Sequence, residues 1–344
     1  MTIYEALSRA GGLLAYGIPE FVLPRTAVAA EVAKLTALGV EIRCCALVTP
    51  PPAAELHASA DAVFLGVGAG RPLPLGVPGE LLPGVHTAIS YLFQLTYMRA
   101  YAAPATSTAT STATSTALAG RWVVILGGGN VAIDAARCAR RLGAAVTIAY
   151  RRSRAQMPAA ARAVALAMEE GVQVRELLAP LRIEGTATAP VAAAAGTSSN
   201  LKRAADCDSD VQDANTLLVP AGRAAAVVLQ PQLLGPPDAS GRASVRPDSD
   251  ASPVRLRADS VVVCIGQGRN AAAERAWAPL GVRFTQRGTV QLANGACAAA
   301  AADGLWHCAV GWALSCFRFC ELTSGNASVL FPLRPALFFC CFGR

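Results

Sequence analysis

The 344-residue sequence contains no C-x-x-C pair, although it has 11 cysteines. Cys44–Cys45 and Cys340–Cys341 are adjacent pairs, and Cys316 and Cys320 are four positions apart. None of these spacings fits an iron–sulfur or zinc site, so we predict no metal site. Free thiols suit a reducing compartment, which favours a cytoplasmic location and leaves an organellar one open.

Histidine and aromatic residues are also scarce. The three histidines, His57, His86 and His307, lie far apart and near no nucleophile, so we assign no catalytic residue. Aromatic residues make up only 6% of a chain whose net charge is +7. A basic chain with few aromatic residues is a poor match for nucleic-acid binding, and we expect none.

We also expect neither a membrane-spanning segment nor a leader. The first residues already have the pattern of a strand, so we expect no signal peptide. The apolar stretch 327–342 is interrupted by Arg334 and two prolines and is shorter than a bilayer span. Its final run, 336–342, is expected to form a docking or aggregation surface if it is exposed.

The most informative segment that is present is a strand, glycine turn and helix at 122–134. Gly127, Gly129 and Ala132 occupy the three positions of G-x-G-x-x-G/A. The first glycine permits a tight turn, the second lets the backbone approach a pyrophosphate, and the alanine lets the helix pack closely. The helix N-terminus adds N–H groups and partial positive charge. A glycine turn in an unrelated α/β protein is the alternative. The predicted dinucleotide-binding residues are Gly127, Gly128, Gly129, Asn130, Val131 and Ala132.

The residues after the second strand, 145–150, indicate which dinucleotide binds. NAD sites place an acid there, whereas NADP sites place arginine for the 2′-phosphate. This chain has Arg151-Arg152-Ser153-Arg154 and no carboxylate. Between Arg121 and Arg154 there are seven arginines and one acid. A solvated surface is the alternative, but the position favours NADPH, with Arg151 and Arg152 on its 2′-phosphate.

A repeated pattern of helix, glycine and strand predicts the fold class. It occurs around Gly39, Gly143 and Gly171. Alternating helices and strands of this length imply an α/β fold with a mostly parallel sheet covered on both faces. The length favours two domains. Two stretches of low complexity, about 102–116 and 185–215, are interpreted as flexible insertions.

Several motifs, in the same order, resemble one family. They are 127–137, 150–154 with Met157-Pro158, 11–24, 237–242 and 258–267. Together they resemble the small (beta) subunit of NADPH-dependent glutamate synthase and related FAD- and NADPH-binding pyridine nucleotide-disulfide-type oxidoreductases. The similarity covers roughly residues 1–290.

This resemblance implies two Rossmann-like dinucleotide-binding domains, with an NADPH domain inserted into an incomplete FAD domain. The implied segments are 1–97 (FAD, first part), 98–117 (linker), 118–257 (NADPH, with a disordered insertion at 185–215) and 258–344 (FAD return segment with a divergent tail). The implied FAD contacts are Glu5, on the ribose, with Gly12, Leu13, Gly68 and Gly266.

The implied activity is hydride transfer from NADPH to FAD, with electrons passing to an iron–sulfur or glutamate synthase large-subunit-like amidotransferase partner. The protein orients the cofactors, which supply the chemistry. In the family, a strand and a second G-x-G-x-x-G precede the acid at Glu5, and a late aspartate contacts the flavin. This sequence starts at the acid-bearing strand and has no aspartate in 304–312. We therefore expect the chain alone to hold FAD weakly, and a truncated, non-catalytic NADPH-binding module is the alternative.

Overall fold

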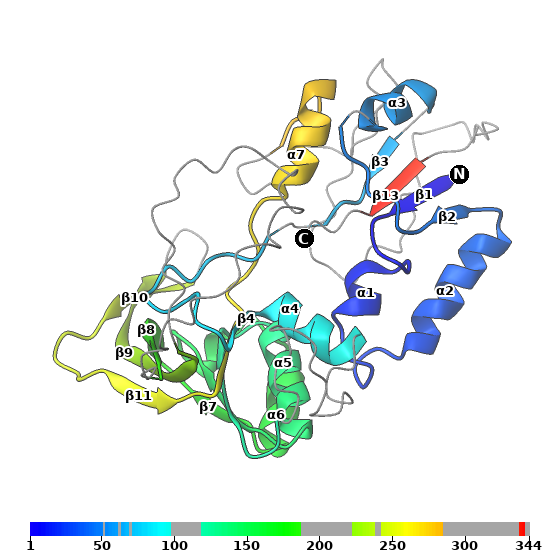
Figure 1. The fold of residues 1–344 in the computed structure, drawn as a ribbon. Coiled ribbons are helices and arrows are strands. Elements are labelled where there is room, and N and C mark those ends of the chain that lie inside the picture. Colours follow the sequence, from blue (N-terminus) through cyan, green and yellow to red (C-terminus); the bar gives the residue numbers. More distant parts are fainter. Residues whose placement is uncertain are drawn as a thin grey trace, which may run out of the picture. The chain divides into compact units, whose positions relative to one another are not determined.

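The computed structural model describes residues 1–50, 52–60, 63–68, 71–97, 118–186, 222–237, 242–284 and the strand 337–340 (Figure 1). The chain forms two compact units. Unit 1 comprises Met1–Leu73, Leu92–Arg99 and Ile265–Arg344, and unit 2 comprises Pro74–Tyr91 and Ala100–Cys264.

Unit 2 contains a five-stranded sheet in which all neighbouring strands are parallel. Its order is β4 (Val85–Thr87), β12 (Ser260–Val263), β5 (Trp122–Leu126), β6 (Ala145–Ala149) and β7 (Gln173–Arg175). The central strand is apolar and buried from Val123 to Leu126, as expected for a strand covered on both sides.

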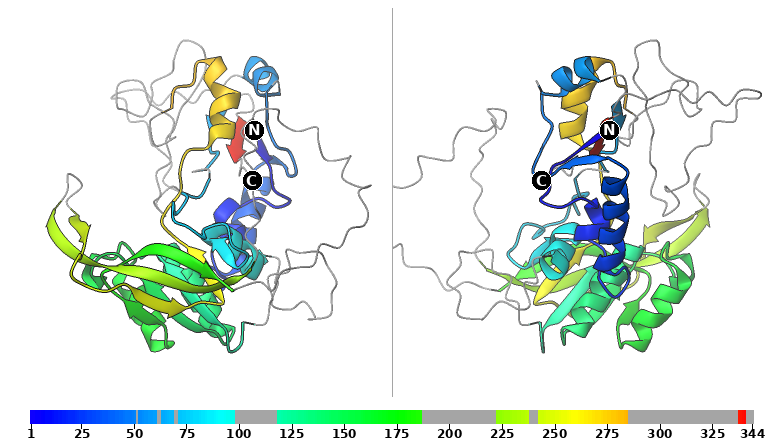
Figure 2. Two further views of the ribbon diagram at one scale, coloured as in Figure 1. Left: turned by 60° about the vertical axis from the view of Figure 1, so that its left-hand side comes forward. Right: turned by 90° about the vertical axis from the view of Figure 1, so that its right-hand side faces the viewer.

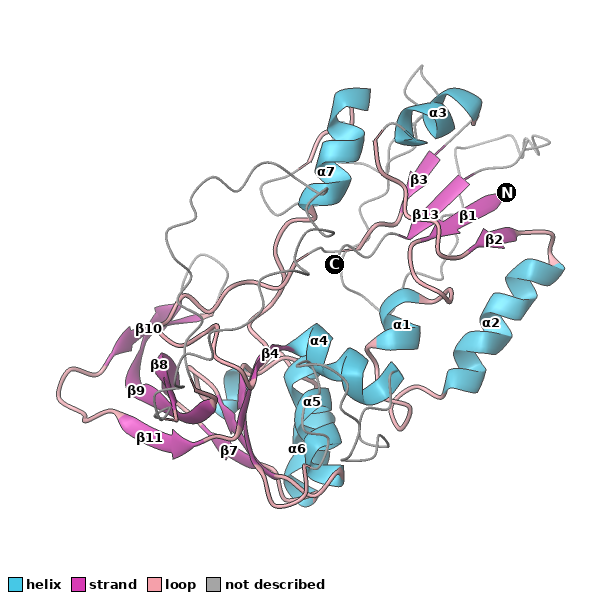
Figure 3. Ribbon diagram, in the orientation of Figure 1, coloured by secondary structure: helices cyan, strands magenta, loops and turns pink. Residues whose placement is uncertain are grey.

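A second, antiparallel sheet in unit 2 was not predicted. It consists of β8 (Leu178–Gly185), the long β9 (Ala224–Pro237), β10 (Ala243–Pro247) and β11 (Val254–Arg257) (Figure 3). Val124 and Leu126 of β5 share a core with Val227 and Leu229 of β9. The antiparallel sheet therefore packs on the parallel one.

Helices α5 (Asn130–Arg141) and α6 (Ala161–Glu169) pack against each other, and α5 also contacts β5 and β6 (Figure 2). Short elements complete the unit: α4 (Ala88–Leu92), whose last residue falls in unit 1, and the 3₁₀ turn η3 (Arg154–Gln156). The parallel sheet thus has helices and a second sheet as its covering layers.

Unit 1 contains a four-stranded parallel sheet in the order β2 (Glu41–Arg43), β1 (Thr2–Glu5), β13 (Leu337–Cys340) and β3 (Val63–Leu65). Its helices are α1 (Gly12–Tyr16), α2 (Arg25–Ala37), α3 (Pro52–Ser59), the π-helix η1 (Phe93–Tyr97), α7 (Ala271–Trp277) and the 3₁₀ turn η4 (Ala278–Leu280). Trp277 of α7 is buried with Val63 and Leu65 of β3.

All three predicted repeats of helix, glycine and strand are present, so the α/β fold class is confirmed. Gly39 follows α2 and precedes β2, Gly143 lies between α5 and β6, and Gly171 lies between α6 and β7. Each of these glycines has φ between 84° and 89°. This left-handed conformation is the one that glycine favours at the C-terminal end of a helix.

Part of the apolar run 336–342, which was expected to form a docking or aggregation surface if it is exposed, forms a strand of the unit 1 sheet. Leu337–Cys340 forms β13, and its backbone pairs with β1 on one side and with β3 on the other. Both edges of the strand are therefore occupied within the sheet, and no edge is left to pair with another chain.

The compact units differ from the expected segments in two places. β4 lies within 1–97 and β12 within 258–344, yet both strands complete the sheet of unit 2. The predicted linker 98–117 and most of the 185–215 insertion lie outside the described residues. Within the residues that the structure describes, no helix has the length and apolarity that crossing a membrane requires.

Candidate functional site

The predicted dinucleotide turn lies between β5 and α5. Gly127 follows β5 directly, has φ 138°, and donates its N–H to the Ala149 carbonyl at 3.1 Å. A Cβ at this position would lie 2.2 Å from the carbonyl oxygen of Cys264. The fold itself therefore requires glycine at position 127.

The next two glycines differ from each other. A Cβ at Gly128 would lie 2.7 Å from the ring of Tyr150, so the protein excludes a side chain there as well. At Gly129 nothing lies within 4 Å of an added Cβ, and φ is −86°, which any residue adopts. No contact within the described part of the chain therefore explains why position 129 is glycine.

Helix α5 begins at Asn130 with its N-terminal end available to a ligand. No side chain caps this end, and its first turn has no acidic residue. Asn130 Oδ1 accepts the Ala160 N–H at 2.9 Å, which holds the loop before α6 against the turn. Ala132 is fully buried, as expected if its small side chain lets the helix pack on the sheet. Val131 is half-buried.

The two predicted phosphate-binding arginines occupy different environments. Arg151 is exposed, and its guanidinium has no hydrogen bond or ion pair among the described residues. Arg152 is buried, and its Nε donates to the Ala243 carbonyl at 2.7 Å. Arg152 thus connects the end of β6 to β10, whereas Arg151 is free to meet a phosphate.

Three of the seven arginines counted in this region lie on α5 and contact α6. Glu170, directly after α6, accepts from Arg137 at 2.8 Å and from Arg141 at 2.7 Å. Arg140 donates to the Glu170 carbonyl at 2.8 Å. The Arg141 and Arg137 hydrogen bonds lower the pKa of Glu170 to about 2. Much of the local positive charge therefore joins two helices and is not presented to a ligand.

The sequence alone did not identify three buried ionisable groups near this turn. Asp134 lies on the second turn of α5, and burial raises its pKa to about 6. Burial raises the pKa of Cys138, also on α5, to about 12. The Tyr91 hydroxyl is fully buried without a hydrogen-bond partner among the described residues, and burial raises its pKa too. A motif shows positions along the chain, but it cannot show which side chains lose contact with water.

In unit 1, Glu5 stands at the carboxyl end of β1, as predicted. Its side chain is only 1% exposed, and Oε1 accepts the Leu7 N–H at 2.8 Å. Burial raises the pKa of this carboxyl group, although backbone hydrogen bonds from Leu7 and Ala6 oppose the shift. The predicted ribose acid is thus buried, and its carboxyl group is hydrogen-bonded to the backbone.

Gly12 and Leu13 begin α1, and a network of hydroxyl groups holds the loop before them. The buried Tyr16 hydroxyl accepts the Arg9 N–H at 2.7 Å and lies 3.2 Å from Ser8 Oγ. Gly11 and Gly12 have φ 116° and 48°. The backbone thus turns sharply between β1 and α1, where the flavin segment was predicted.

Gly68 and Gly266 lie in two loops of unit 1 that meet, although they are far apart in sequence. Asn270 Nδ2 donates to the Val67 carbonyl at 3.1 Å, and Leu73 N donates to the Gly266 carbonyl at 3.1 Å. Both glycines are exposed, with φ 76° and 117°. The structure therefore brings this pair of predicted positions into one region.

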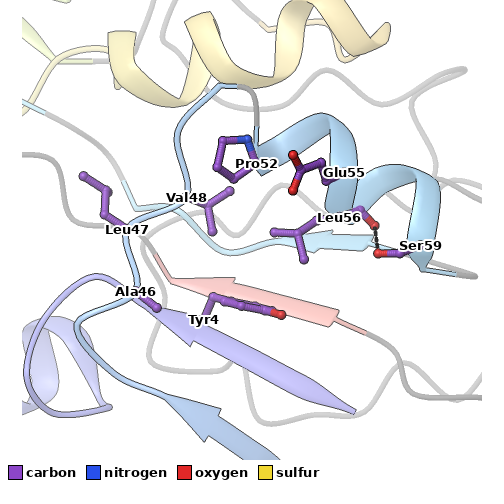
Figure 4. Close-up of a pocket in the computed structure, with 8 residues that line it drawn as sticks. All are labelled: Tyr4, Ala46, Leu47, Val48, Pro52, Glu55, Leu56 and Ser59. Atoms are coloured by element: carbon purple, nitrogen blue, oxygen red, sulfur yellow. Dashed lines mark hydrogen bonds between the residues drawn. The ribbon is translucent and has the colours of Figure 1, made fainter.

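A cavity of about 510 Å³ lies between α3, the loop after β2 and the ring of Tyr4 (Figure 4). Leu56 and Glu55 of α3 line one side, and Ala46 to Val48 line another. None of the predicted cofactor-binding residues lines this cavity.

Comparison with known proteins identifies the family. The model of the family described as "Pyridine nucleotide-disulphide oxidoreductase" matches residues 30–233, which is more than half of the chain. The chain belongs to this family. The resemblance found in the sequence is thereby confirmed. Members of the family are NADPH-dependent oxidoreductases, and their cofactors are FAD and NADPH.

Curated relatives are similar over about half of this oxidoreductase. The glutamate synthase [NADPH] small chain of Halomonas elongata is 40% identical over 173 residues, covering 49% of this chain and 35% of the relative. The NADPH-Fe(3+) oxidoreductase subunit beta of Geobacter sulfurreducens is 37% identical over 192 residues, covering 53% and 26%. The chain therefore spans about a third or less of the length of these relatives.

A solved structure supports the fold. The oxidoreductase FprA from Mycobacterium tuberculosis superposes with a TM-score of 0.60 at 19% identity, covering 90% of this chain and 71% of FprA. At this identity the likeness concerns the fold alone, and it agrees with Rossmann-like α/β units.

Proposed function

We propose that this oxidoreductase binds NADPH at the turn between β5 and α5 and passes hydride to FAD. The pyrophosphate lies on the backbone from Gly127 to Ala132, at the uncapped N-terminus of α5. Arg151 holds the 2′-phosphate, and Arg152 positions the segment that carries Arg151. Bound NADPH supplies the hydride, and the protein supplies orientation and charge.

The observation that supports this proposal most directly is the contrast among the three glycines. The protein's own atoms require glycine at 127 and 128, but they leave open space where a side chain at 129 would project. A pyrophosphate seated on the turn needs that space, because its oxygens must approach the backbone N–H groups. The turn thus leaves room for a pyrophosphate at the place that a Cβ at position 129 would occupy.

The test is thermal stabilisation by saturating NADPH, since a ligand that binds only the native state raises Tm. Gly129→Val should fold with the Tm of the parent but lose the NADPH-dependent increase. If the variant is stabilised as much as the parent, the turn is not the binding site.

Cofactor choice provides a second test. NADPH should stabilise the parent far more than NADH does. Arg151→Gln should weaken NADPH binding by roughly 10- to 100-fold, because one charge-assisted contact contributes about 1.5–3 kcal/mol, and it should leave NADH binding unchanged. Arg283→Gln, an exposed arginine in unit 1, is the matched control. Equal affinities of the parent for the two nucleotides would exclude the 2′-phosphate assignment.

For FAD, we propose unit 1, with Glu5 on the ribose and Gly12, Leu13, Gly68 and Gly266 along the flavin. The support is that Glu5 ends β1, Gly12 and Leu13 begin the helix that follows, and Gly68 lies in the loop after β3, since α/β sheets bind ligands at the carboxyl ends of their strands. Gly266 lies in a loop that contacts the segment after β3. Unit 2 is then the NADPH domain, and its sheet includes β4 and β12.

Electron transfer to a separate partner is part of the proposal. The relatives from Halomonas elongata and Geobacter sulfurreducens are named as a small chain and a subunit beta, respectively, so each works within a larger assembly. We propose an iron–sulfur or large-subunit-like acceptor for this chain. Reduction of a one-electron dye by NADPH would test turnover without that partner.

A non-catalytic NADPH-binding module is the second candidate, and the burial of Glu5 favours it. A carboxyl group that is 1% exposed cannot meet a ribose unless its surroundings move. Flavin content separates the candidates: stoichiometric FAD in the purified protein supports the enzyme, and a colourless protein that binds NADPH supports the module.

A further inference from the structure

Cys44 and Cys45 form a pair of adjacent thiols on the surface of unit 1. They directly follow β2, which ends at Arg43, and both residues are exposed. Adjacent residues of a strand point to opposite sides, which would bury one of the two side chains. Cys45 interrupts that alternation, because its φ is 55°, a conformation that few residues other than glycine adopt.

Two backbone hydrogen bonds hold this bend in place. Cys45 N donates to the Leu7 carbonyl at 2.9 Å, and Ala46 N donates to the Glu5 carbonyl at 2.9 Å. The loop after β2 is thus fixed to the loop after β1, so the two thiols remain together on a defined piece of backbone.

The environments of the two thiols differ. Partial burial and the nearby Glu5 carboxylate raise the pKa of Cys44. Cys44 therefore remains largely a thiol near neutral pH, and Cys45 is the partner that meets a reagent first. The other cysteines whose surroundings are described, Cys138 and Cys264, have pKa values raised by burial, which makes them poor nucleophiles.

We propose that Cys44 and Cys45 are a reversible thiol–disulfide site, oxidised by a small-molecule disulfide of the glutathione type. The Cys45 thiolate attacks one sulfur of the oxidant, so that a mixed disulfide forms and one thiolate leaves and takes up a proton. Cys44 then loses its proton to solvent and attacks the Cys45 sulfur, which releases the second thiol. The two cysteines lose two electrons, and the oxidant is reduced to two thiols.

The disulfide formed in this way is easily reduced. Adjacent Cα atoms are about 3.8 Å apart across a trans peptide. Disulfides usually join Cα atoms about 4.4–6.8 Å apart, and departures from that range store strain. Strained, exposed disulfides have more oxidising potentials than structural ones and act as labile or regulatory bonds. The site therefore responds to the ratio of oxidised to reduced thiol and reverts when reductant is added.

The experiment uses the whole chain and mass spectrometry. The protein is incubated with oxidised glutathione, remaining thiols are blocked with N-ethylmaleimide, and the chain is digested with trypsin without reduction. Trypsin cleaves after Arg43, and the sequence from Cys44 to Arg99 contains no other cysteine. In the oxidised parent we expect this peptide to be lighter than its reduced form by two hydrogen atoms and to carry no N-ethylmaleimide. After treatment with reductant it should take up two N-ethylmaleimide labels.

Two serine variants test the order of attack. Cys44→Ser should retain one glutathione on Cys45, because the resolving thiol is absent. Cys45→Ser should remain reduced and take up one label. The proposal is overturned if the parent peptide takes up two labels after oxidation, keeps a stable bound glutathione, or pairs with a cysteine elsewhere. It does not depend on the cofactor assignment, since disulfide formation is read from mass alone.

Discussion

The turns that follow β5 in unit 2 and β1 in unit 1 begin alike and end differently. Each follows a strand of a parallel sheet and leads through glycine to a helix. After β5, the fold requires Gly127 and Gly128, and Gly129 stands free of protein contacts. At the end of β1, Glu5 is buried, and its carboxyl group accepts a hydrogen bond from the Leu7 N–H. A glycine can be assigned to ligand binding only where no contact within the protein already explains it, as at position 129.

The largest expected effect breaks the unit 2 turn itself. Gly127→Ala places a Cβ 2.2 Å from the Cys264 carbonyl oxygen, at a φ of 138° that alanine does not favour. We expect the free energy of unfolding to fall by roughly 3–5 kcal/mol, measured by urea denaturation.

Gly129→Ala is the matched control, because its Cβ meets nothing within 4 Å. It should unfold at nearly the same urea concentration as the parent, within about 0.5 kcal/mol for a position whose φ is ordinary. If the two variants lose equal amounts of unfolding free energy, Gly127 and Gly129 do not have separate structural and ligand-binding roles.

A second prediction concerns the ion pairs that join α5 to α6. Glu170→Gln removes the charge that Arg137 and Arg141 share, and it should cost about 2–3 kcal/mol at pH 7. Since the pKa of Glu170 is lowered to about 2, its stabilising contribution is complete above its ordinary value of 4.5 and is lost as the pH falls toward 2.

Calorimetry across that pH range checks the prediction. The Gln variant should lack this part of the parent's acid destabilisation, whereas Glu169→Gln, an exposed neighbour, should behave like the parent. A parent and a Glu170→Gln variant with parallel pH profiles would contradict it.

A third prediction separates the two arginines after β6. Arg152→Gln loses a buried hydrogen bond to the Ala243 carbonyl and should lower the free energy of unfolding by about 1–2 kcal/mol. Arg151→Gln should change it by less than about 0.5 kcal/mol, because the residue is exposed. The same urea measurement serves for each variant, and the reverse ranking would contradict the structural role assigned to Arg152.

The smallest expected change in stability is in unit 1, where a substitution at Glu5 should stabilise the protein instead of destabilising it. Burial raises the pKa of Glu5, so its favourable contribution is present below its ordinary pKa and is lost as the pH rises. Glu5→Gln keeps an oxygen for the Leu7 N–H and should stabilise the protein by about 0.5–1 kcal/mol at pH 8. Near pH 3 the variant and the parent should melt together, and a variant that is less stable at pH 8 would show that the carboxylate is needed as a charge.

Sequence analysis predicted the parts of this fold that depend on local pattern. The helix–glycine–strand repeats and the turn at Gly127 follow from periodicity and from glycine's backbone freedom. The antiparallel sheet was missed because β9 contains Pro231, Gly235 and a final pair of prolines, which resemble a loop. β13 was missed because its partners lie at the other end of the sequence.

For the site, the sequence indicated which residues stand near the turn but not which way they point. Arg151 and Arg152 look alike in a sequence pattern, and the buried hydrogen bond from Arg152 to the Ala243 carbonyl of β10 is what distinguishes them. Burial of Asp134 and Tyr91 likewise depends on elements that are far apart in sequence. Contacts between distant segments determine these environments, and no local spacing encodes them.

The pairing of β13 has a consequence for the order of folding during synthesis. All strands of unit 2 lie between Val85 and Val263, so its sheets can assemble while the chain is still being made. In unit 1, Thr2 pairs with Leu337, and β1 reaches β3 only through that late strand. Closing so long a loop is entropically costly and slow. Unit 2 can therefore be complete while unit 1 still lacks β13, one of its two inner strands. During that interval unit 1 is most accessible to chaperones and proteases.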